Sequence, residues 1–407
     1  MTRYEIKKIF SRKASKAALL LLLAVLILVL NFTITDLFYV NEQGENEYGL
    51  RAIAKVREVK KEWAGELTED QIRKVIEENV RIAQTPEALS ENLDQNNVAF
   101  SWKQGLMDIR NLLVYDYGGF SDYNYYLPDS LSPEAASEFY PNRIKNLKEW
   151  LDTEAAGEFT EGEKAYLIDN YESLETPLYY DYQDGWYSLF QYAPTVIMVT
   201  TLVLGFLCAG IFSSEFQQRA SAVFYASFYG RDRAVAAKIK AGLVVVTVIY
   251  WSMILLYTVL VLGIFGADGA GCQIQSTSSG WKSIYHITNL QEYLLTVFGG
   301  YAGCLFMMLL TMLVSAKTNS AVLAVLVPFV LIFLPSFLSE VDIPLQKKVL
   351  GLLPDQLLQM TLVVKYFNLY GIGGKIFPAA PLLLILYTSL CIVMLPSVYR
   401  IYRKKQA

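Results

Sequence analysis

"SSEFQQRASAVFYASFYGRDRAVAAKIKAG", residues 213–242, lies between two long apolar runs and carries seven charged side chains. The flanking runs, residues 189–212 and 241–266, are each long enough to cross a bilayer, because about 20 helical residues span the hydrocarbon core. The charged stretch is therefore predicted to be a loop at a membrane surface. The rest of the chain indicates on which side of the membrane this loop lies.

The apolar runs place the chain among integral membrane proteins. Of its 407 residues, 54% are hydrophobic. The first run follows a basic segment, as a secretory signal does, but its apolar core is longer and no clear cleavage site follows. We interpret it as an uncleaved first span. We predict an all-α polytopic fold with six transmembrane helices at residues 17–39, 189–212, 241–266, 293–316, 319–339 and 376–399.

Lysine and arginine gather in three short segments. Residues 1–16 contain six, the loop 213–240 contains five, and the tail after Tyr399 contains four. Short basic segments are retained on the cytoplasmic side, so the loop and both termini are expected there, in a multi-pass protein of the cell membrane. The basic inner surface suits anionic lipid headgroups. Alternation of the spans then puts three segments outside: residues 40–188, 267–292 and 340–375.

The large outer segment, residues 40–188, is predicted to be a mainly helical extracellular domain. It has 30 acidic and 14 basic residues, and long translocated domains are largely exempt from the positive-inside bias. Apolar residues recur at helical spacing from Glu47 to Ala83, and a turn with Thr68 as N-cap is expected to divide this pattern into two helices. Further helices are expected near residues 88–115, 133–151 and 161–173.

Two tyrosine clusters lie in this outer part of the chain. Residues 179–194 adjoin the second span, which favours an interfacial aromatic belt over a ligand platform. For residues 115–130, core packing and a binding face remain equally open. The segment 343–367 predicts short amphipathic helices broken at Pro354, either re-entrant or resting on lipid.

The sequence contains no recognisable catalytic or metal-binding motif. His286 is the only histidine, which excludes a Ser-His-Asp triad, an H-E-x-x-H zinc site and a histidine metal cluster. The glycines of residues 370–377 lack the spacing of a phosphate-binding loop and are expected in a loop before the last span. We expect no enzymatic activity, no cofactor, no metal and no nucleic-acid partner. Energy for any transport must then come from another subunit.

Apolar side chains lie among the charges of the loop, at Val223, Phe224, Phe228 and Val235. This pattern predicts a short helix that lies along the inner membrane face and docks a partner. A merely solvated loop is the alternative, but it gives no reason for the aromatic residues gathered at 224–229.

Residues 212–242 resemble the segment after the second span in type-2 permease subunits of ATP-binding-cassette (ABC) exporters. A glutamate, a small-residue stretch, a Gly-Arg or Ser-Arg pair and a lysine opening the third span recur in that family. The matching positions here are Glu215, Ala220, Gly230 with Arg231, and Lys238. Ala220 departs from the family, where a glycine is frequent, and this departure affects the details of docking.

The resemblance extends to both ends of the chain. "YEIKKIFSRKASKAALLLLL", residues 4–23, resembles the basic amphipathic elbow helix of the family, and residues 369–406 resemble its last span and basic tail. The large domain after the first span is similar to that of sodium- or drug-efflux permeases. The elbow, residues 1–16, would lie on the bilayer with Ile6, Ile9 and Phe10 on its apolar side.

The resemblance implies a mechanism in which two permease subunits, identical or different, form the pathway and two cytoplasmic ATPases bind beneath. Closure of the ATPases would be transmitted through the loop 213–240. Glu215 and Arg231 would then be ionic contacts or a pair that fixes the loop. The remaining coupling residues would be the anchors Phe224 and Phe228, Gly230 beside Arg231, and Lys238 at the start of the third span.

Two other classes of protein remain open. A membrane-anchored receptor or sensor would use the acidic outer domain to bind a ligand, but six spans and a docking loop exceed what a simple input domain needs. A structural membrane scaffold would not need the loop pattern. An ATPase gene beside this one would favour the exporter. The sequence does not identify the transported substrate.

Overall fold

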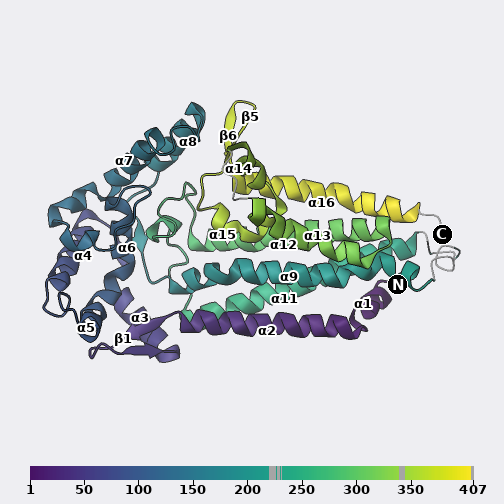
Figure 1. The fold of residues 1–407 in the computed structure, drawn as a ribbon, viewed down its shortest axis with the longest axis horizontal. Coiled ribbons are helices and arrows are strands. Elements are labelled where there is room, and N and C mark those ends of the chain that lie inside the picture. The colour runs from purple at the N-terminus through teal and green to yellow at the C-terminus, as the bar shows by residue number, and fades with distance from the viewer. Residues whose placement is uncertain (220–225, 227–229, 231, 339–343, 405–407) are drawn as a thin grey trace.

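The molecule consists of a bundle of long helices with a helical domain at one end (Figure 1). The computed structural model describes residues 1–219, 226, 230, 232–338 and 344–404. The bundle contains α1 (Thr2–Phe10), α2 (Lys13–Thr35), α9 (Asp184–Gln217), α11 (Arg233–Phe265), α12 (Asn289–Thr318), α13 (Ala321–Leu338), α14 (Pro344–Leu350), η5 (Pro354–Gln359), α15 (Met360–Val363), β5 (Leu369–Ile372), β6 (Lys375–Pro378) and α16 (Ala379–Arg403).

Between α2 and α9 the chain forms the outer domain, and a short helical turn follows α11. The elements of these parts are β1 (Phe38–Val40), β2 (Asn46–Tyr48), α3 (Leu50–Lys61), β3 (Gly65–Glu66), α4 (Glu69–Ala83), α5 (Leu93–Lys103), η1 (Gln104–Leu106), α6 (Met107–Tyr117), η2 (Leu127–Ser130), η3 (Pro133–Glu138), α7 (Phe139–Asp152), α8 (Glu161–Glu172), β4 (Tyr179–Tyr180) and η4 (Ile274–Ser276).

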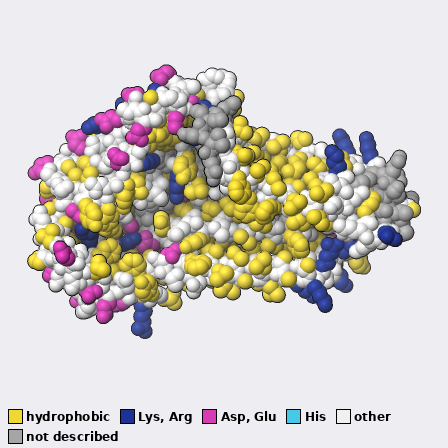
Figure 2. All heavy atoms as spheres, in the orientation of Figure 1, with side chains coloured by type: hydrophobic (Ala, Val, Ile, Leu, Met, Phe, Trp, Pro, Cys, Tyr) yellow, Lys and Arg dark blue, Asp and Glu magenta, His cyan; other side chains and the backbone are white. Residues whose placement is uncertain are grey.

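Six helices of the described residues, α2, α9, α11, α12, α13 and α16, are long and apolar enough to cross a membrane. The predicted all-α polytopic fold is therefore confirmed. Exposed side chains such as Leu20, Leu21 and Ile27 of α2 face outward, and apolar atoms cover the middle of the bundle (Figure 2). Such a surface suits lipid tails, which are as apolar as leucine.

The two ends of the bundle carry opposite kinds of charge. Both termini lie at the end farthest from the outer domain (Figure 1), and lysine and arginine side chains gather there, whereas acidic side chains are spread over the domain (Figure 2). We call the first the basic end and the second the domain end. The predicted placement of both termini on one side agrees with this arrangement, and the cytoplasmic assignment of that side stays a prediction.

The outer domain forms around helices that its sequence predicts. The hydroxyl of Thr68 accepts a hydrogen bond from the amide of Gln71, so the predicted N-cap of α4 is confirmed. Ile72, Val75 and Ile76 of α4 are fully buried in the domain core. The helix expected over 88–115 is instead two helices, α5 and α6, joined by the tighter turn η1. The helix expected over 133–151 begins as the turn η3 and continues as α7, and the third expected helix is α8.

The domain is larger than residues 40–188, because the loop between α11 and α12 completes it. Trp281 from this loop is buried in the domain core beside Phe139, with ring centroids 5.0 Å apart. The buried guanidinium of Arg143 on α7 donates hydrogen bonds to the carbonyl oxygens of Trp281 and Ser283, at 2.9 and 3.1 Å. The domain and the bundle therefore share one packed boundary.

A second contact fixes the domain onto α9. Lys60 of α3 pairs with Asp184, the first residue of α9, at 2.7 Å and with Asp108 at 3.0 Å. Burial opposes the charged form of Lys60, but the two carboxylates outweigh it and raise its pKa. Since Lys60 remains charged, this contact holds the domain at the end of a membrane-spanning helix.

The two tyrosine clusters contain both buried and exposed side chains. Tyr180 and Tyr182 are fully buried, so the predicted aromatic belt is wrong for them, whereas Tyr187 is 54% exposed. In the other cluster, Tyr125 lies against the buried guanidinium of Arg110, whose centre is 4.3 Å from the ring centroid. Buried tyrosine rings contribute a large apolar area to packing.

Part of the segment after α13 packs against α12, although Val349, Leu362 and Tyr366 are exposed. Pro354 begins η5, which confirms the predicted break there, and Leu357 and Met360 are fully buried. α12 accepts η5 closely because it has glycines on one face: a Cβ on Gly303 would lie 2.9 Å from Leu357 Cβ, and one on Gly299 2.9 Å from Met360 Cε. This small-xxx-small spacing is typical of close packing between membrane segments. The re-entrant segment and the helix resting on lipid both stay predictions.

The predicted loop before the last span is a β-hairpin. β5 and β6 pair antiparallel, and Ile372 lies opposite Lys375. Gly373 and Gly374 form the two-residue turn with φ of 59° and 79°. Such a turn requires positive φ at both central residues, which glycine adopts without steric penalty. The last span therefore begins at Ala379, after the hairpin.

Candidate functional site

The loop that connects α9 and α11 at the basic end is flanked by α1. The predicted N-terminal helix forms at Thr2–Phe10, and its apolar side chains Ile6, Ile9 and Phe10 pack against the bundle core. Ile9 is 7% exposed. Because α1 contacts both α9 and α11, it lies across the two helix ends that hold the loop.

Four charged side chains from these three helices form what we call the ion cluster: Glu5 and Lys8 of α1, Glu215 of α9 and Lys238 of α11. Lys238 Nζ lies 2.7 Å from Glu215 Oε1 and 3.1 Å from Glu5 Oε2. Lys8 Nζ is 2.7 Å from the same Glu215 oxygen. Two cations and two anions therefore offset one another within the chain.

Burial makes the ion cluster energetically important. The side chain of Lys238 is fully buried and that of Glu215 is 8% exposed. Lys238 Nζ also donates to the carbonyl oxygen of Ile211 at 2.9 Å, and Ser214 Oγ donates to the second Glu215 oxygen at 3.2 Å. Buried charges are tolerated only when paired and hydrogen-bonded. These contacts meet that requirement, so the cluster holds α1, α9 and α11 together.

The last span is also tied to this end of the bundle. The hydroxyl of Tyr402 on α16 donates to the carbonyl oxygen of Phe212 at 3.1 Å, and their ring centroids are 4.4 Å apart. The hydroxyl of Tyr399 donates to the carboxylate of Asp232, just before α11. The N-terminal helix α1 and the C-terminal helix α16 therefore both contact the helix ends that flank the loop.

Two of the predicted coupling residues, Glu215 and Lys238, are brought together by the fold. Glu215 is buried, and its carboxylate contacts Lys238 and Lys8. Its expected contact with Arg231 falls on a residue outside the described part of the chain. Lys238 lies near the start of α11 and is fully buried, and its expected place at the membrane interface stays a prediction. Gly230 lies in a turn and is buried. The remaining predicted positions, Ala220, Phe224, Phe228 and Arg231, lie outside the described residues.

Sequence reasoning did not identify Glu5 and Lys8 as members of the site. A signal was present, because Glu5 is the single acidic residue among the six basic residues of positions 1–16. An isolated acidic residue in a basic segment suggests an internal ion pair. Its partner is 233 residues away, which no local pattern indicates.

The ion cluster consists of lysine and glutamate side chains that pair with one another. It contains no histidine or cysteine, and its carboxylates are engaged by lysines. Across the described part of the chain, no group of three or more histidine, cysteine, aspartate or glutamate side chains is arranged to hold a metal ion. The arrangement ties α1 to the ends of α9 and α11.

No family model, curated protein or solved structure matches this chain.

Proposed function

We propose that this chain is the membrane-spanning permease subunit of an ATP-driven ABC exporter. In this proposal it pairs with a second permease subunit, and a separate cytoplasmic ATPase binds beneath the basic end. The observation that carries the proposal is the ion cluster, which joins α1 to the ends of α9 and α11. The loop predicted over 213–240 is shorter, because α9 ends at Gln217 and α11 begins at Arg233. A loop that receives force from a partner needs such a rigid base.

The energetics of the ion cluster favour movement as one body. Separating Lys238 from Glu215 would leave each buried charge with one partly exposed partner, Glu5 or Lys8, and breaking a buried pair costs about 3–5 kcal/mol. A partner that pulls or pushes the loop would therefore displace α1 and the ends of α9 and α11 together. Unfolding the ends of α1, α9 and α11 locally would break these ion pairs, whereas moving the three helix ends together would keep them.

α9 gives this displacement a route to the far side of the membrane. The helix is continuous over 34 residues, and at about 1.5 Å per residue it extends roughly 50 Å. Glu215 lies near one end, and Asp184 at the other end pairs with Lys60 of the outer domain. Movement of the loop would thus reach the domain through one helix and two buried ion pairs.

Exposed basic side chains beside the loop favour an acidic docking surface on the partner. Arg219 follows the last turn of α9 and Lys240 lies in the second turn of α11, and both are exposed. Charge complementarity of this kind orients partners and raises association rates. We expect acidic side chains on the ATPase surface that meets them.

The test is co-purification of the ATPase with the tagged chain from membranes of the cells that produce it, followed by measurement of ATP hydrolysis. In the double variant Arg219→Glu with Lys240→Glu, the amount of ATPase that co-purifies should fall at least about tenfold, since two acidic side chains would now face the acidic surface of the partner. Glu91→Lys, an exposed reversal in the outer domain, is the matched control and should retain it fully.

Two results would contradict the proposal. One is ATP hydrolysis by the purified chain without any second subunit. The other is a loop variant that keeps both the ATPase and transport-linked hydrolysis at the level of Glu91→Lys.

A further inference from the structure

A cavity of about 820 Å³ lies in the outer domain, between α5 and the segment that leads into η2. We call it the α5 cavity. Helix α5 lines it with Asn96, Phe100 and Lys103, which follow one another at steps of four and three residues and therefore share one face of the helix. The segment around η2 contributes Tyr125 and Asp129. The cavity is thus formed by two parts of the domain that the fold brings together.

A charged contact joins these two parts. Lys103 Nζ lies 3.3 Å from Asp129 Oδ1, and Arg110 Nη2 of α6 donates to the same oxygen at 2.9 Å. The side-chain amide of Asn79 on α4 donates a third hydrogen bond to this oxygen, also at 2.9 Å. One carboxylate oxygen therefore receives three donors, and two of these donors are cationic.

This contact keeps one positive charge in excess. Among the described residues, Asp129 is the only carboxylate within 4.0 Å of Lys103 or Arg110 and the only one in the cavity lining. The two cationic side chains are 11% and 0% exposed, and Arg110 Nη1 has no hydrogen-bond partner in the described part of the chain. Burial lowers the pKa of Lys103, although Asp129 opposes this effect. The ammonium group is therefore poorly solvated and can accommodate a further anionic acceptor.

Aromatic rings lie next to this charge. The guanidinium centre of Arg110 is 4.3 Å from the ring centroid of Tyr125, and Tyr126 packs edge-on against Tyr125 with ring centroids 5.2 Å apart. Phe100 lies one helical turn before the cationic lysine of α5, and its ring centroid is 6.3 Å from that of Phe38 in β1. Tyr126 is 73% exposed. The α5 cavity therefore offers ring surface to an apolar group beside a cation.

Carboxamide side chains complete the lining. Asn46 belongs to β2, Gln84 follows the last residue of α4, and Asn96 and Asn97 lie on α5. Each of these side chains has a carbonyl oxygen that accepts hydrogen bonds and an amino group that donates them. A peptide group has the same two functions. The α5 cavity thus combines a cation, ring surface and amides in one concave region of the domain.

We propose that the α5 cavity binds an N-acylated amino acid that has a free carboxylate and an apolar side chain, with the carboxylate at Lys103 and the side chain against Phe100 and Tyr126. Charge-assisted hydrogen bonds from lysine to a carboxylate are stronger than neutral ones, and the volume lies within the range of small-molecule sites. The ligand is either a small molecule or the last residue of a peptide, because both present the same groups. The site is independent of the ion cluster and goes beyond the proposed export function.

A saturation-transfer NMR titration of N-acetyl-L-phenylalanine into the full chain in phosphatidylcholine nanodiscs tests this site, with empty nanodiscs as background. We expect saturable binding with a Kd below about 1 mM, and at least about tenfold weaker binding of N-acetyl-L-phenylalaninamide and of acetate. The first lacks the carboxylate, and the second lacks the ring and the amide. Lys103→Gln should weaken binding about tenfold or more. Lys74→Gln, an exposed change on α4, should leave binding unchanged.

The domain should stay folded in Lys103→Gln, because Arg110 still pairs with Asp129 and the two charges then balance. Lys103→Arg keeps the positive charge and should restore most of the binding, which separates loss of the carboxylate contact from misfolding.

A tripeptide, N-acetyl-alanyl-alanyl-phenylalanine with a free carboxylate, identifies the source of the ligand. Binding at least about tenfold tighter than that of the single acylated residue means that the cavity takes the end of a peptide, and similar binding means that it takes a small molecule. Each result supports the site. Absence of saturable binding, equal binding of N-acetyl-L-phenylalanine and its amide, or equal binding by Lys103→Gln and Lys74→Gln would overturn the proposal.

Discussion

Lysine and glutamate side chains meet at both ends of this molecule, with different results. At the basic end, Lys8 and Glu215 are 207 residues apart in the chain, and the ion cluster they belong to encloses a fully buried Lys238. At the domain end, Lys348 and Glu163 are 185 residues apart, and the lysine remains 41% exposed beside a large cavity. The same residue types thus build a closed junction in one place and an open site in the other.

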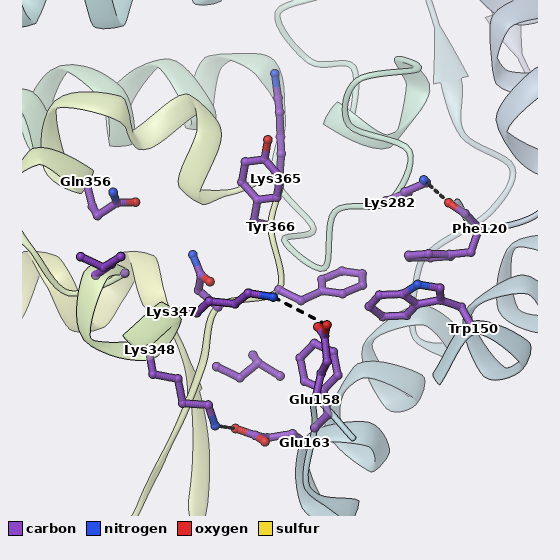
Figure 3. A pocket seen from close by; sticks show the side chains of 16 residues that line it. Phe120, Trp150, Glu158, Glu163, Lys282, Lys347, Lys348, Gln356, Lys365 and Tyr366 are labelled. Carbon is purple, nitrogen blue, oxygen red and sulfur yellow. Dashed lines mark hydrogen bonds and ion pairs between the residues drawn. The ribbon is translucent and has the colours of Figure 1, made fainter. Parts of the chain in front are cut away.

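The surrounding packing explains this difference. At the basic end α1, α9 and α11 converge, and two lysines and two glutamates from these helices pair with one another. At the domain end Lys348 of α14 pairs with Glu163 of α8, and Lys347 pairs with Glu158, which lies between α7 and α8, beside the cavity that Figure 3 shows. Breaking a fully buried pair is costly, whereas a pair that stays partly exposed contributes little. Four predictions test this contrast.

The largest effect is expected for accessibility from outside the cell, because the membrane should separate the two ends of the molecule completely. In intact cells, an impermeant thiol reagent should label Ser121→Cys in the outer domain and should not label Gln218→Cys at the basic end until the membrane is permeabilised; both positions are exposed. The parent chain should have Cys391 replaced, because this native cysteine is only partly buried. Labelling of both positions in intact cells would contradict the assignment of the two ends to opposite sides of the membrane.

The native Cys272 is a poor reporter for that experiment, although its position in an outer loop suggests otherwise. Its side chain is 1% exposed, and burial raises the pKa of its thiol to about 11. The thiolate is the reactive form. Cys272 should therefore stay unlabelled in the folded protein on either side of the membrane.

The second-largest effect is expected when the ion cluster is disrupted. Lys238→Ala leaves Glu215 buried with only Lys8 as a counter-charge, and we expect a loss of about 3–5 kcal/mol in the free energy of unfolding. Lys240→Ala, at an exposed position two residues away, should change the free energy of unfolding by less than about 0.5 kcal/mol. Reversible unfolding in mixed micelles measures both. Equal stability of the two variants would show that the ion cluster does not hold the helices.

A third prediction concerns the segment that forms one side of the cavity. Gly303→Leu would press against Leu357 and should destabilise the protein by about 1–3 kcal/mol, because added volume forces packed elements apart. Gly263→Leu on α11 has no atom within 4 Å of the new Cβ and should be neutral or slightly stabilising. Thermal unfolding compares the two. Similar unfolding temperatures would mean that η5 does not depend on its close contact with α12.

The smallest effect is expected at the open end. Burial works against the charged form of Glu163, but Lys348 and the cap residue Thr160 outweigh it and hold the pKa of Glu163 below its usual 4.5. A carboxylate with a lowered pKa adds stability above its unfolded-state pKa and loses it as the pH falls through the folded value. The contribution of this pair should therefore be present at pH 6 and disappear on acidification below about pH 4.5.

Lys348→Ala tests this pH dependence. It should lower the free energy of unfolding by about 1 kcal/mol or less at pH 6, and the difference from the original chain should shrink at pH 3. Lys148→Ala, which removes an exposed partner of Glu172, is the control. A difference that stays constant between pH 6 and pH 3 would show that Glu163 does not stabilise the contact between α8 and α14.

Much of the fold follows from local patterns. The six spans follow from apolar runs, the start of α4 from Thr68, and the break in the outer segment from Pro354. Each depends on neighbouring residues, so a single sequence is sufficient to predict it. The tyrosine belt was the weaker inference, since Tyr180 and Tyr182 face the domain core and local composition does not distinguish a core from an interface.

Which residues far apart in the sequence contact one another was decided by the tertiary structure alone. No local pattern paired Glu215 with Lys238 and Lys8, and the fold brings them together because the ends of α1, α9 and α11 converge. Trp281 joins the outer domain from a distant loop for the same reason. The sequence by itself determined which segments are apolar, basic or acidic, since these are properties of each segment. Which charges meet, and whether a cavity remains between them, depends on how those segments pack, and packing brings together residues that no local pattern connects.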